Sequence, residues 1–148
     1  MKPLWCGVTI AAAAVVATTN AEEDEHKIER SALPPAVERT VTEQSQGAKI
    51  RGFSEESENG VTYYEVELVV GDHGKDVLID TNGKVVEIEE EVALGAVPAD
   101  ARRELEAKAK GDRIAKVEAL SKDGRVVAYE AEVGRGARKR EIEAKLKN

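Results

Sequence analysis

The side chains that could perform catalysis are few in this chain of 148 residues. Nucleophilic catalysis needs a base within hydrogen-bond reach of a nucleophile, and histidine is the commonest base. The chain has two histidines, His26 in an acidic stretch and His73 in a Gly-Asp-His-Gly turn. Neither stands in a motif that supplies both a nucleophile and an orienting acid. The sequence therefore predicts a protein that is not an enzyme, with no catalytic residue and no cofactor.

A cation site is the other chemistry that these residues suggest. Asp72 and Asp76 lie on either side of His73, and Asp80 and Asn82 lie in the turn that follows. That turn lacks the remaining ligands of a calcium-binding loop, and its Asp-Thr-Asn-Gly sequence is typical of a hairpin turn. We therefore predict no metal site. Binding of a small ligand or a divalent cation, by a sensor or buffer outside the cytoplasm, is the alternative function.

Charge is distributed unevenly between the two halves of the chain. Residues 22–96 carry a net charge of −12, and residues 97–148 carry a net charge of +4. The densest basic patch consists of Arg135, Arg138, Lys139 and Arg140. This patch could contact an acidic protein surface or phosphate groups, or it could be a soluble hairpin end paired with the acidic half. No aromatic residues alternate with it to stack on bases, so nucleic acid is not an expected partner.

Residues 1–21 have the features of a secretory signal peptide. Lys2 supplies the positive charge, residues 8–17 form an apolar run, and Ala21 ends a cleavage site of small residues. A membrane-spanning helix needs about 20 apolar residues, and this run is shorter. Cleavage would remove Cys6, the only cysteine, so the exported chain could form no disulfide. We predict a periplasmic or secreted bacterial protein with no integral membrane segment after signal cleavage.

The rest of the chain contains two stretches with the same order of features, 64 positions apart. Each begins at a proline suited to the first turn of a helix, and each helix is expected to end at a glycine, Gly47 or Gly111. Asn-Gly at 59–60 and Asp-Gly at 123–124 then predict β-hairpins. The predicted organisation is a signal peptide (1–21), a disordered acidic linker (22–32) and two repeats (33–92 and 97–148).

The strand after the first hairpin alternates between apolar and acidic residues. Its apolar residues are expected to face the helix, whereas Tyr63, Glu65 and Glu67 point the other way. Glu87 and Glu89 alternate in the same manner in a later strand, which completes an exposed acidic face. Tyr63 is either a cross-strand packing residue or the aromatic contact residue of this face.

Four segments of the first repeat carry a family signature: 33–37 (LPPAV), 47–50 (GAKI), 63–68 (YYEVEL) and 80–85 (DTNGKV). Together they resemble PepSY-like domains of the subgroup called β-lactamase-inhibitor-like, and the second repeat matches as far as Val133. The resemblance implies an α+β fold of two tandem PepSY-like repeats, each with one helix packed on one face of an antiparallel sheet. It implies no catalytic residues, and it fits a suggested role in restraining hydrolases.

These observations predict an exported, non-catalytic protein that engages or restrains another envelope or secreted protein. The expected contact residues lie on the open sheet face and at the basic hairpin end: Tyr63, Glu65, Glu67, Arg135, Arg138, Lys139 and Arg140. Because complementary charge rather than apolar burial would hold such a complex together, we expect transient and salt-sensitive binding.

Overall fold

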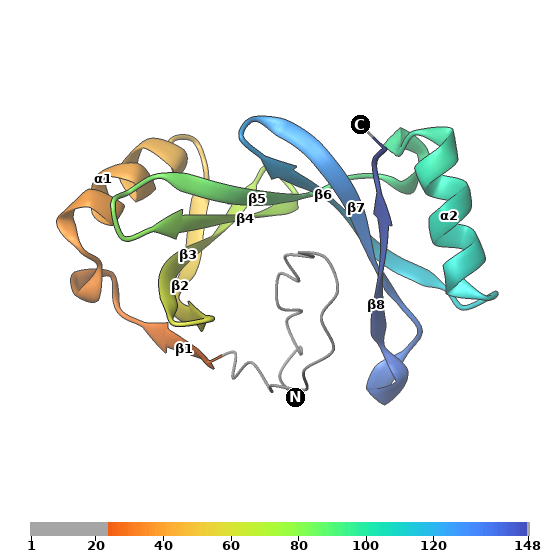
Figure 1. Ribbon diagram of the computed structural model, residues 1–148, viewed down its shortest axis with the longest axis horizontal. Helices are drawn as coiled ribbons and strands as arrows, with labels where there is room; N and C mark the ends of the chain where they lie inside the picture. The colour runs from red at the N-terminus through yellow and green to blue at the C-terminus, as the bar shows by residue number, and fades with distance from the viewer. Residues whose placement is uncertain (1–23, 148) are drawn as a thin grey trace.

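The computed structural model describes residues 24–147, and its dominant feature is one eight-stranded antiparallel sheet. The strands lie side by side in the order in which they occur in the chain (Figure 1). They are β1 (Asp24–Ile28), β2 (Lys49–Glu58), β3 (Val61–Val70), β4 (His73–Asp80), β5 (Val85–Glu91), β6 (Ile114–Lys122), β7 (Arg125–Val133) and β8 (Arg140–Lys145). The connections hold α1 (Pro35–Gln44), α2 (Ala99–Ala109) and the 3-10 helices Arg30–Ala32, Leu94–Ala96 and Gly136–Arg138.

The predicted α+β fold of two tandem repeats, each with one helix packed on one face of an antiparallel sheet, is wrong, and whether the two halves share a sheet was not specified by the sequence. β5 pairs directly with β6, from Ile88 opposite Ser121 to Glu91 opposite Glu118, so both halves of the chain contribute to one sheet. This pairing satisfies the backbone groups of two strand edges that would otherwise be unpaired. The fold is therefore dominated by one sheet. The prediction failed because the periodicity within a strand does not specify which strand edges pair.

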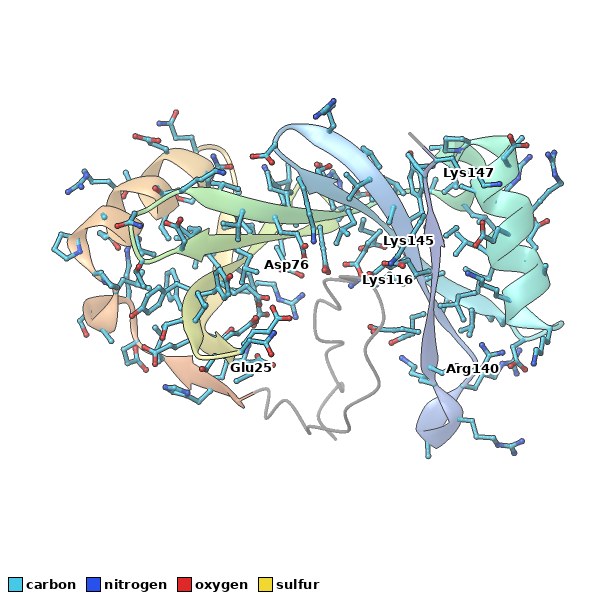
Figure 2. The ribbon with its side chains drawn as sticks, in the orientation of Figure 1. Glu25, Asp76, Lys116, Arg140, Lys145 and Lys147 are labelled. Atoms are coloured by element: carbon cyan, nitrogen blue, oxygen red, sulfur yellow. The ribbon has the colours of Figure 1, made fainter. Side chains whose placement is uncertain are left out.

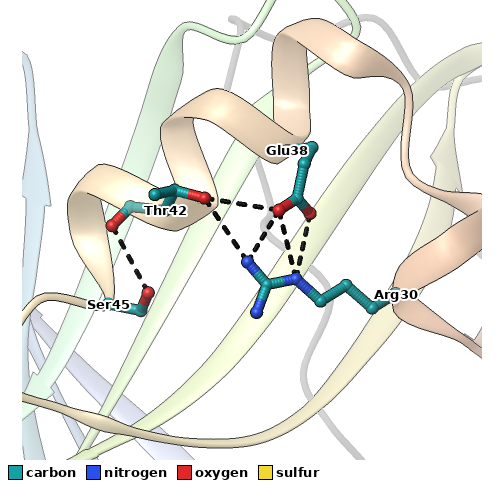
Figure 3. Close-up of polar contacts among 4 residues, drawn as sticks. All are labelled: Arg30, Glu38, Thr42 and Ser45. Carbon is teal, nitrogen blue, oxygen red and sulfur yellow. Dashed lines mark hydrogen bonds and ion pairs between the residues drawn. The ribbon is translucent and has the colours of Figure 1, made fainter.

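The predicted disordered linker is also wrong for residues 24–32. β1 pairs antiparallel with β2, and the 3-10 helix that follows leads into α1. A charged segment can form an edge strand because the strand needs only backbone partners on one side. The Arg30 guanidinium then ties this segment to α1, since its Nη2 donates to Glu38 Oε1 at 2.6 Å and its Nε donates at 3.1 Å (Figure 3). The predicted signal peptide lies outside the described residues.

Both helices pack on the same face of the sheet, one towards each end (Figure 1). α1 buries Val37 and Val41 in a first hydrophobic cluster, which includes residues of β2, β3 and β4. α2 buries Ala101, Leu105 and Ala109 in a second cluster with residues of β6, β7 and β8. The four-residue spacing of these apolar positions therefore marks the buried side of each helix.

The two predicted hairpin turns are confirmed. Asn59 and Gly60 join β2 to β3 with φ angles of 51° and 79°, and Asp123 and Gly124 join β6 to β7 with φ angles of 49° and 74°. Two successive residues with positive φ are the mark of the type I′ turn, whose twist matches that of the strands.

A third turn, between β4 and β5, is held against α1. The Thr40 hydroxyl donates to the Gly83 carbonyl oxygen at 2.6 Å. Gly83 has a φ of +86°, and a Cβ atom there would lie 2.6 Å from the Ala36 carbonyl oxygen. Only glycine satisfies both the backbone conformation and the close approach of the helix.

Candidate functional site

The face of the sheet opposite the helices carries carboxyl groups on every strand. Cross-strand register aligns them, because Glu67 is opposite Asp76, which is opposite Glu89. We call this surface the acidic face and define it by one carboxyl group per strand: Glu25, Glu56, Glu65, Asp76, Glu89, Glu118, Glu130 and Glu143. The sheet is curved, and Glu25, Asp76 and Lys116 lie on its inner side (Figure 2). Carboxyl groups are therefore concentrated on the side that the helices leave uncovered.

A shallow hollow with room for about one water molecule lies within the acidic face, over β2 to β5. It is lined by Glu56, Glu65, Asp76, Leu78, Glu87 and Glu89. Of these, Glu65 and Glu87 are each 4% exposed and Glu89 is 9% exposed. The prediction that these glutamates form an exposed face is therefore wrong. On the inner side of a curved sheet the side chains of neighbouring strands converge, and they cover one another.

Burial changes the protonation of these carboxyl groups. Loss of hydration raises the pKa of Glu65 to about 10, and the nearby charges of Glu56 and Asp76 raise it as well. Loss of hydration likewise raises the pKa of Glu89 to about 9, with a further contribution from Glu130. Both groups are therefore neutral at pH 7. Glu65 donates its proton in a hydrogen bond to the Glu56 carboxylate.

Lysines of β6 pair with some of these carboxylates but not with Glu89. Lys122 Nζ lies 2.9 Å from Glu87 Oε2, and Lys116 Nζ lies 2.5 Å from Glu118 Oε1. The Glu89 side chain makes no hydrogen bond or ion pair with any residue from 24 to 147, and the charges that most affect it are all acidic. Glu89 is thus 9% exposed and has no donor or cation among these residues, but its carboxyl oxygens are not fully buried.

A second buried polar group on this face is also unsatisfied. Ser54 is opposite Lys27 on one side and Glu65 on the other, and its side chain is 0% exposed. Its hydroxyl has no hydrogen-bond partner among the residues that the structure describes. Buried polar groups are normally hydrogen-bonded, so an unpaired hydroxyl at this position does not contribute to stability and needs another explanation.

The predicted contact residues fall into two separate groups. Tyr63, Glu65 and Glu67 share the acidic side of β3, where Tyr63 is half-buried and Glu67 pairs with Lys27. The basic residues lie at the connection between β7 and β8: Arg135, Arg138, Lys139 and Arg140. β4, β5 and β6 lie between β3 and β7, so the two groups do not form one cluster.

Two of the basic residues have partners within the chain. Lys139 Nζ lies 2.7 Å from Glu132 Oε1. The Arg140 Nη2 group donates to the Ala109 carbonyl oxygen at 3.0 Å and to Asp112 Oδ2 at 2.9 Å. Arg140 thereby satisfies a carbonyl group at the C-terminal end of α2, where a positive charge is favourable. Its contacts give it a structural role, and a partner-binding role for the patch stays a prediction.

The sequence did not identify Glu56, Asp76 or Leu78 as part of a site. Strand alternation could have placed Asp76 and Leu78, because they alternate with the buried residues of β4. Glu56 lies close to the hairpin turn, where the pattern does not distinguish strand from loop. No local signal indicates that Glu89 would be buried, because it lies between β4 and the distant strand β6.

Two of the residues considered as cation ligands, His73 and Asp80, have other partners. Among residues 24–147, no group of three or more His, Cys, Asp or Glu side chains is arranged to hold a metal ion. His73 Nε2 lies 3.1 Å from Glu90 Oε1. Asp80 Oδ1 accepts the backbone N–H groups of Asn82 and Lys84 at 2.8 and 2.9 Å, which closes the β4–β5 turn. In the same range, neither α-helix has the length and apolar character to span a membrane.

Family models and curated protein sequences give no match to this chain. Among solved structures, the chain is similar to a DUF2874 family protein from Bacteroides ovatus ATCC 8483, with 16% identity and a TM-score of 0.55, over 76% of this chain and 79% of that chain. It is also similar to a BLIP-like protein from Bacteroides fragilis NCTC 9343, with 16% identity and a TM-score of 0.49, over 76% and 87% of the two chains. The first likeness shows a shared fold.

Proposed function

We propose that this protein is an exported, non-catalytic binding protein whose acidic face engages a basic envelope or secreted protein. The observation that carries the proposal is the concentration of carboxyl groups on one uncovered, inward-curving face of the sheet. Complementary charge between two surfaces steers association and selects the partner. A surface with this charge favours a partner rich in lysine and arginine.

The extent of the acidic face suits a protein rather than a small molecule. Neighbouring strands lie about 4.8 Å apart, so a face that crosses eight strands is on the order of 30 Å wide. Specific protein interfaces bury about 800 Å² on each partner, which a face of this width can supply. The hollow has room for about one water molecule and is far smaller than the pockets that enclose drug-sized ligands.

The contacts of the two histidines support a non-catalytic role. His26 Nε2 lies 3.7 Å from Glu55 Oε1, and His73 pairs with Glu90. Both therefore face carboxylates rather than a serine, threonine or cysteine nucleophile, which general-base activation requires. Restraint of a hydrolase, which the family resemblance implies, is the narrower form of the proposal.

Expression of the full chain in a bacterium, followed by recovery from the periplasm, tests this proposal. An intact mass that corresponds to residues 22–148 would establish export and the cleavage site. The purified protein is then immobilised and exposed to an envelope extract at low and at high salt. We expect it to retain basic proteins at about 0.05 M salt and to release them at about 0.5 M, because screening shortens the range of surface charges.

Charge reversal supplies the matched control. Glu25 on β1 is an exposed residue of the acidic face, and the exposed Glu141 on β8 lies on the same side of the sheet as Glu143. Glu106 is an exposed residue of α2 on the other side of the sheet. The double variant Glu25→Lys with Glu141→Lys is expected to lose the retained proteins, whereas Glu106→Lys keeps them. No salt-dependent partner, or equal retention by both variants, would count against the acidic face as the binding surface.

A further inference from the structure

We propose that pH controls how firmly the C-terminal strand β8 is docked onto β7, through a proton shared between the carboxyl groups of Glu130 and Glu143. This device concerns the hold of one edge strand on the sheet and needs no partner protein. It would therefore operate whether or not the acidic face binds a basic protein.

Four glutamates form one row across the second half of the sheet. In strand order from β5 to β8 they are Glu91, Glu118, Glu130 and Glu143, and each is the direct register partner of the next. Like charges directly opposite each other on neighbouring strands destabilise a sheet. Such a row is compatible with paired strands only where cations, donors or protons offset part of its charge.

Three of the four glutamates have a partner that is not a carboxyl group. These contacts are Lys116 Nζ with Glu118 Oε1 at 2.5 Å, Lys145 Nζ with Glu143 Oε1 at 3.4 Å, and the backbone N–H of Gly74 with Glu91 Oε2 at 3.3 Å. Glu130 is the exception, because it forms no ion pair with any residue from 24 to 147.

Glu130 instead donates a hydrogen bond to the carboxyl group of Glu143, which is directly opposite on β8. An ionised carboxyl group can only accept hydrogen bonds, so two carboxyl groups bond to each other only when one of them carries a proton. Loss of that proton replaces the hydrogen bond with repulsion between two carboxylates. The proton therefore helps to hold β8 on β7.

β8 has few other contacts that would keep it in place. It is the last strand of the sheet, so its backbone pairs with β7 alone (Figure 1). Of its six residues only Ala144 is buried. Two contacts tie it to α2, since Lys108 Nζ donates to the Glu143 carbonyl oxygen at 2.6 Å and Arg140 Nη2 donates to the Ala109 carbonyl oxygen. Segments with little buried apolar surface open locally, at a lower free energy than the core.

The surroundings of Glu130 determine the pH range of the device. The charged groups that face it come from β5, β6, β7 and β8: Glu87, Glu89, Lys116, Glu118, Glu132, Glu141, Glu143 and Lys145. Loss of hydration raises the pKa of Glu130 from 4.5 to about 7, and the charges of Glu143 and Glu141 raise it as well.

Release of β8 hydrates Glu130 and removes Glu143 from its side, so the pKa of Glu130 returns towards its ordinary range. The proton therefore stabilises the docked strand fully below about pH 4.5, and this stabilisation is lost as the pH rises through about 7. Released β8 would leave β7 as the open edge of the sheet, with unpaired backbone groups.

Amide hydrogen exchange of the exported protein tests this device. Protection factors compare the measured exchange rate with that of an unstructured chain, which removes the intrinsic pH dependence of exchange. We expect the protection of the amides that join β7 to β8 to fall about tenfold or more from pH 5 to pH 7 and to level off above about pH 8. Amides of β3, which is paired on both sides, should be better protected at each pH.

Variants identify the group that titrates. Glu130→Gln is neutral at every pH and can still donate to Glu143, so the protection of β8 should change less than about twofold between pH 5 and pH 8. Glu143→Gln can donate to Glu130 and should reduce the pH dependence in the same way. Glu132→Gln is the matched control, because Glu132 is on the same side of β7 but pairs with Lys139 Nζ at 2.7 Å. It should retain the pH dependence of the unsubstituted protein.

Two results would overturn the inference. The first is the same pH dependence of β8 protection in Glu130→Gln, Glu143→Gln and the unsubstituted protein, because the shared proton would then have no part in docking. The second is equal protection of the β3 and β8 amides at every pH, because β8 would then open only when the whole protein unfolds.

Discussion

Replacement of Glu89 by glutamine is expected to stabilise the unliganded protein at neutral pH but not at acid pH. In the folded protein burial raises the pKa of Glu89 from 4.5 to about 9, whereas the unfolded chain exposes this group to water. Folding at pH 7 therefore requires the carboxylate to take up a proton. Glutamine has nearly the same shape and is neutral at every pH, so it removes this requirement and preserves the packing around the hollow.

The expected gain in the free energy of unfolding at pH 7 follows from the difference between pH 7 and the ordinary pKa of 4.5. A group whose folded pKa is raised contributes its full stability below its unfolded pKa, and that contribution is lost as the pH rises towards the folded pKa. The loss is about 1.4 kcal/mol per pH unit, or about 3 kcal/mol at pH 7. This is a large share of the roughly 5–15 kcal/mol that stabilises a typical domain.

Urea unfolding of the two proteins at a series of pH values measures the effect. The difference in free energy of unfolding should be close to zero at about pH 4 and should grow steadily from about pH 5 to pH 8. Glu106→Gln, on the exposed side of α2, is the control and should change stability by less than about 0.5 kcal/mol at every pH. A difference that is independent of pH, or a variant that is less stable at pH 7, would refute the reasoning that Glu89 is buried and protonated.

Three further predictions concern the scaffold. Gly83→Ala should destabilise the protein by about 1–3 kcal/mol, because the residue has a φ of +86° and the new Cβ would lie 2.6 Å from the Ala36 carbonyl oxygen. Leu105→Ala should cost about 2–5 kcal/mol, because this side chain of α2 is 0% exposed, and urea unfolding at pH 7 checks both values. His73→Gln should lower the melting temperature at about pH 5 but not at about pH 9. The hydrogen bond with Glu90 raises the pKa of His73 above 6.5, so the stability from this pair is full below pH 6.5 and is lost as the pH rises through the raised pKa.

A control for each of these three variants distinguishes the proposed cause from the effect that any substitution can have on stability. Gly60 has a φ of +79° but no atom within 4 Å of a built Cβ, so Gly60→Ala measures backbone strain without the contact to α1. An equal loss in Gly60→Ala and Gly83→Ala would contradict the role of that contact. Val126 is 38% exposed, and Val126→Ala should change stability far less than Leu105→Ala. For His73→Gln, an equal decrease in melting temperature at both pH values would rule out the protonated pair.

Local sequence patterns determined the elements and their sides. Alternation placed Glu65 on one side of β3 and the core residue Tyr64 on the other, because successive side chains of a strand point to opposite faces. Asn59-Gly60 and Asp123-Gly124 predicted hairpins because their backbones readily adopt positive φ. The buried positions of both helices likewise recur every four residues along the sequence. Each of these signals depends on residues that are close together in the chain.

Only the tertiary structure decided how the halves combine and what the acidic face can do. The pairing of β5 with β6 joins segments separated by α2, and nothing within either strand specifies that partner. Glu89 lies between Asp76 of β4 and Leu120 of β6, and burial together with the charge of Glu130 on β7 raises its pKa. Alternation assigned these glutamates to the side away from the helices and so to water. Hydration, however, depends on how many neighbouring strands converge on a curved face, and that is set by contacts between residues far apart in the sequence.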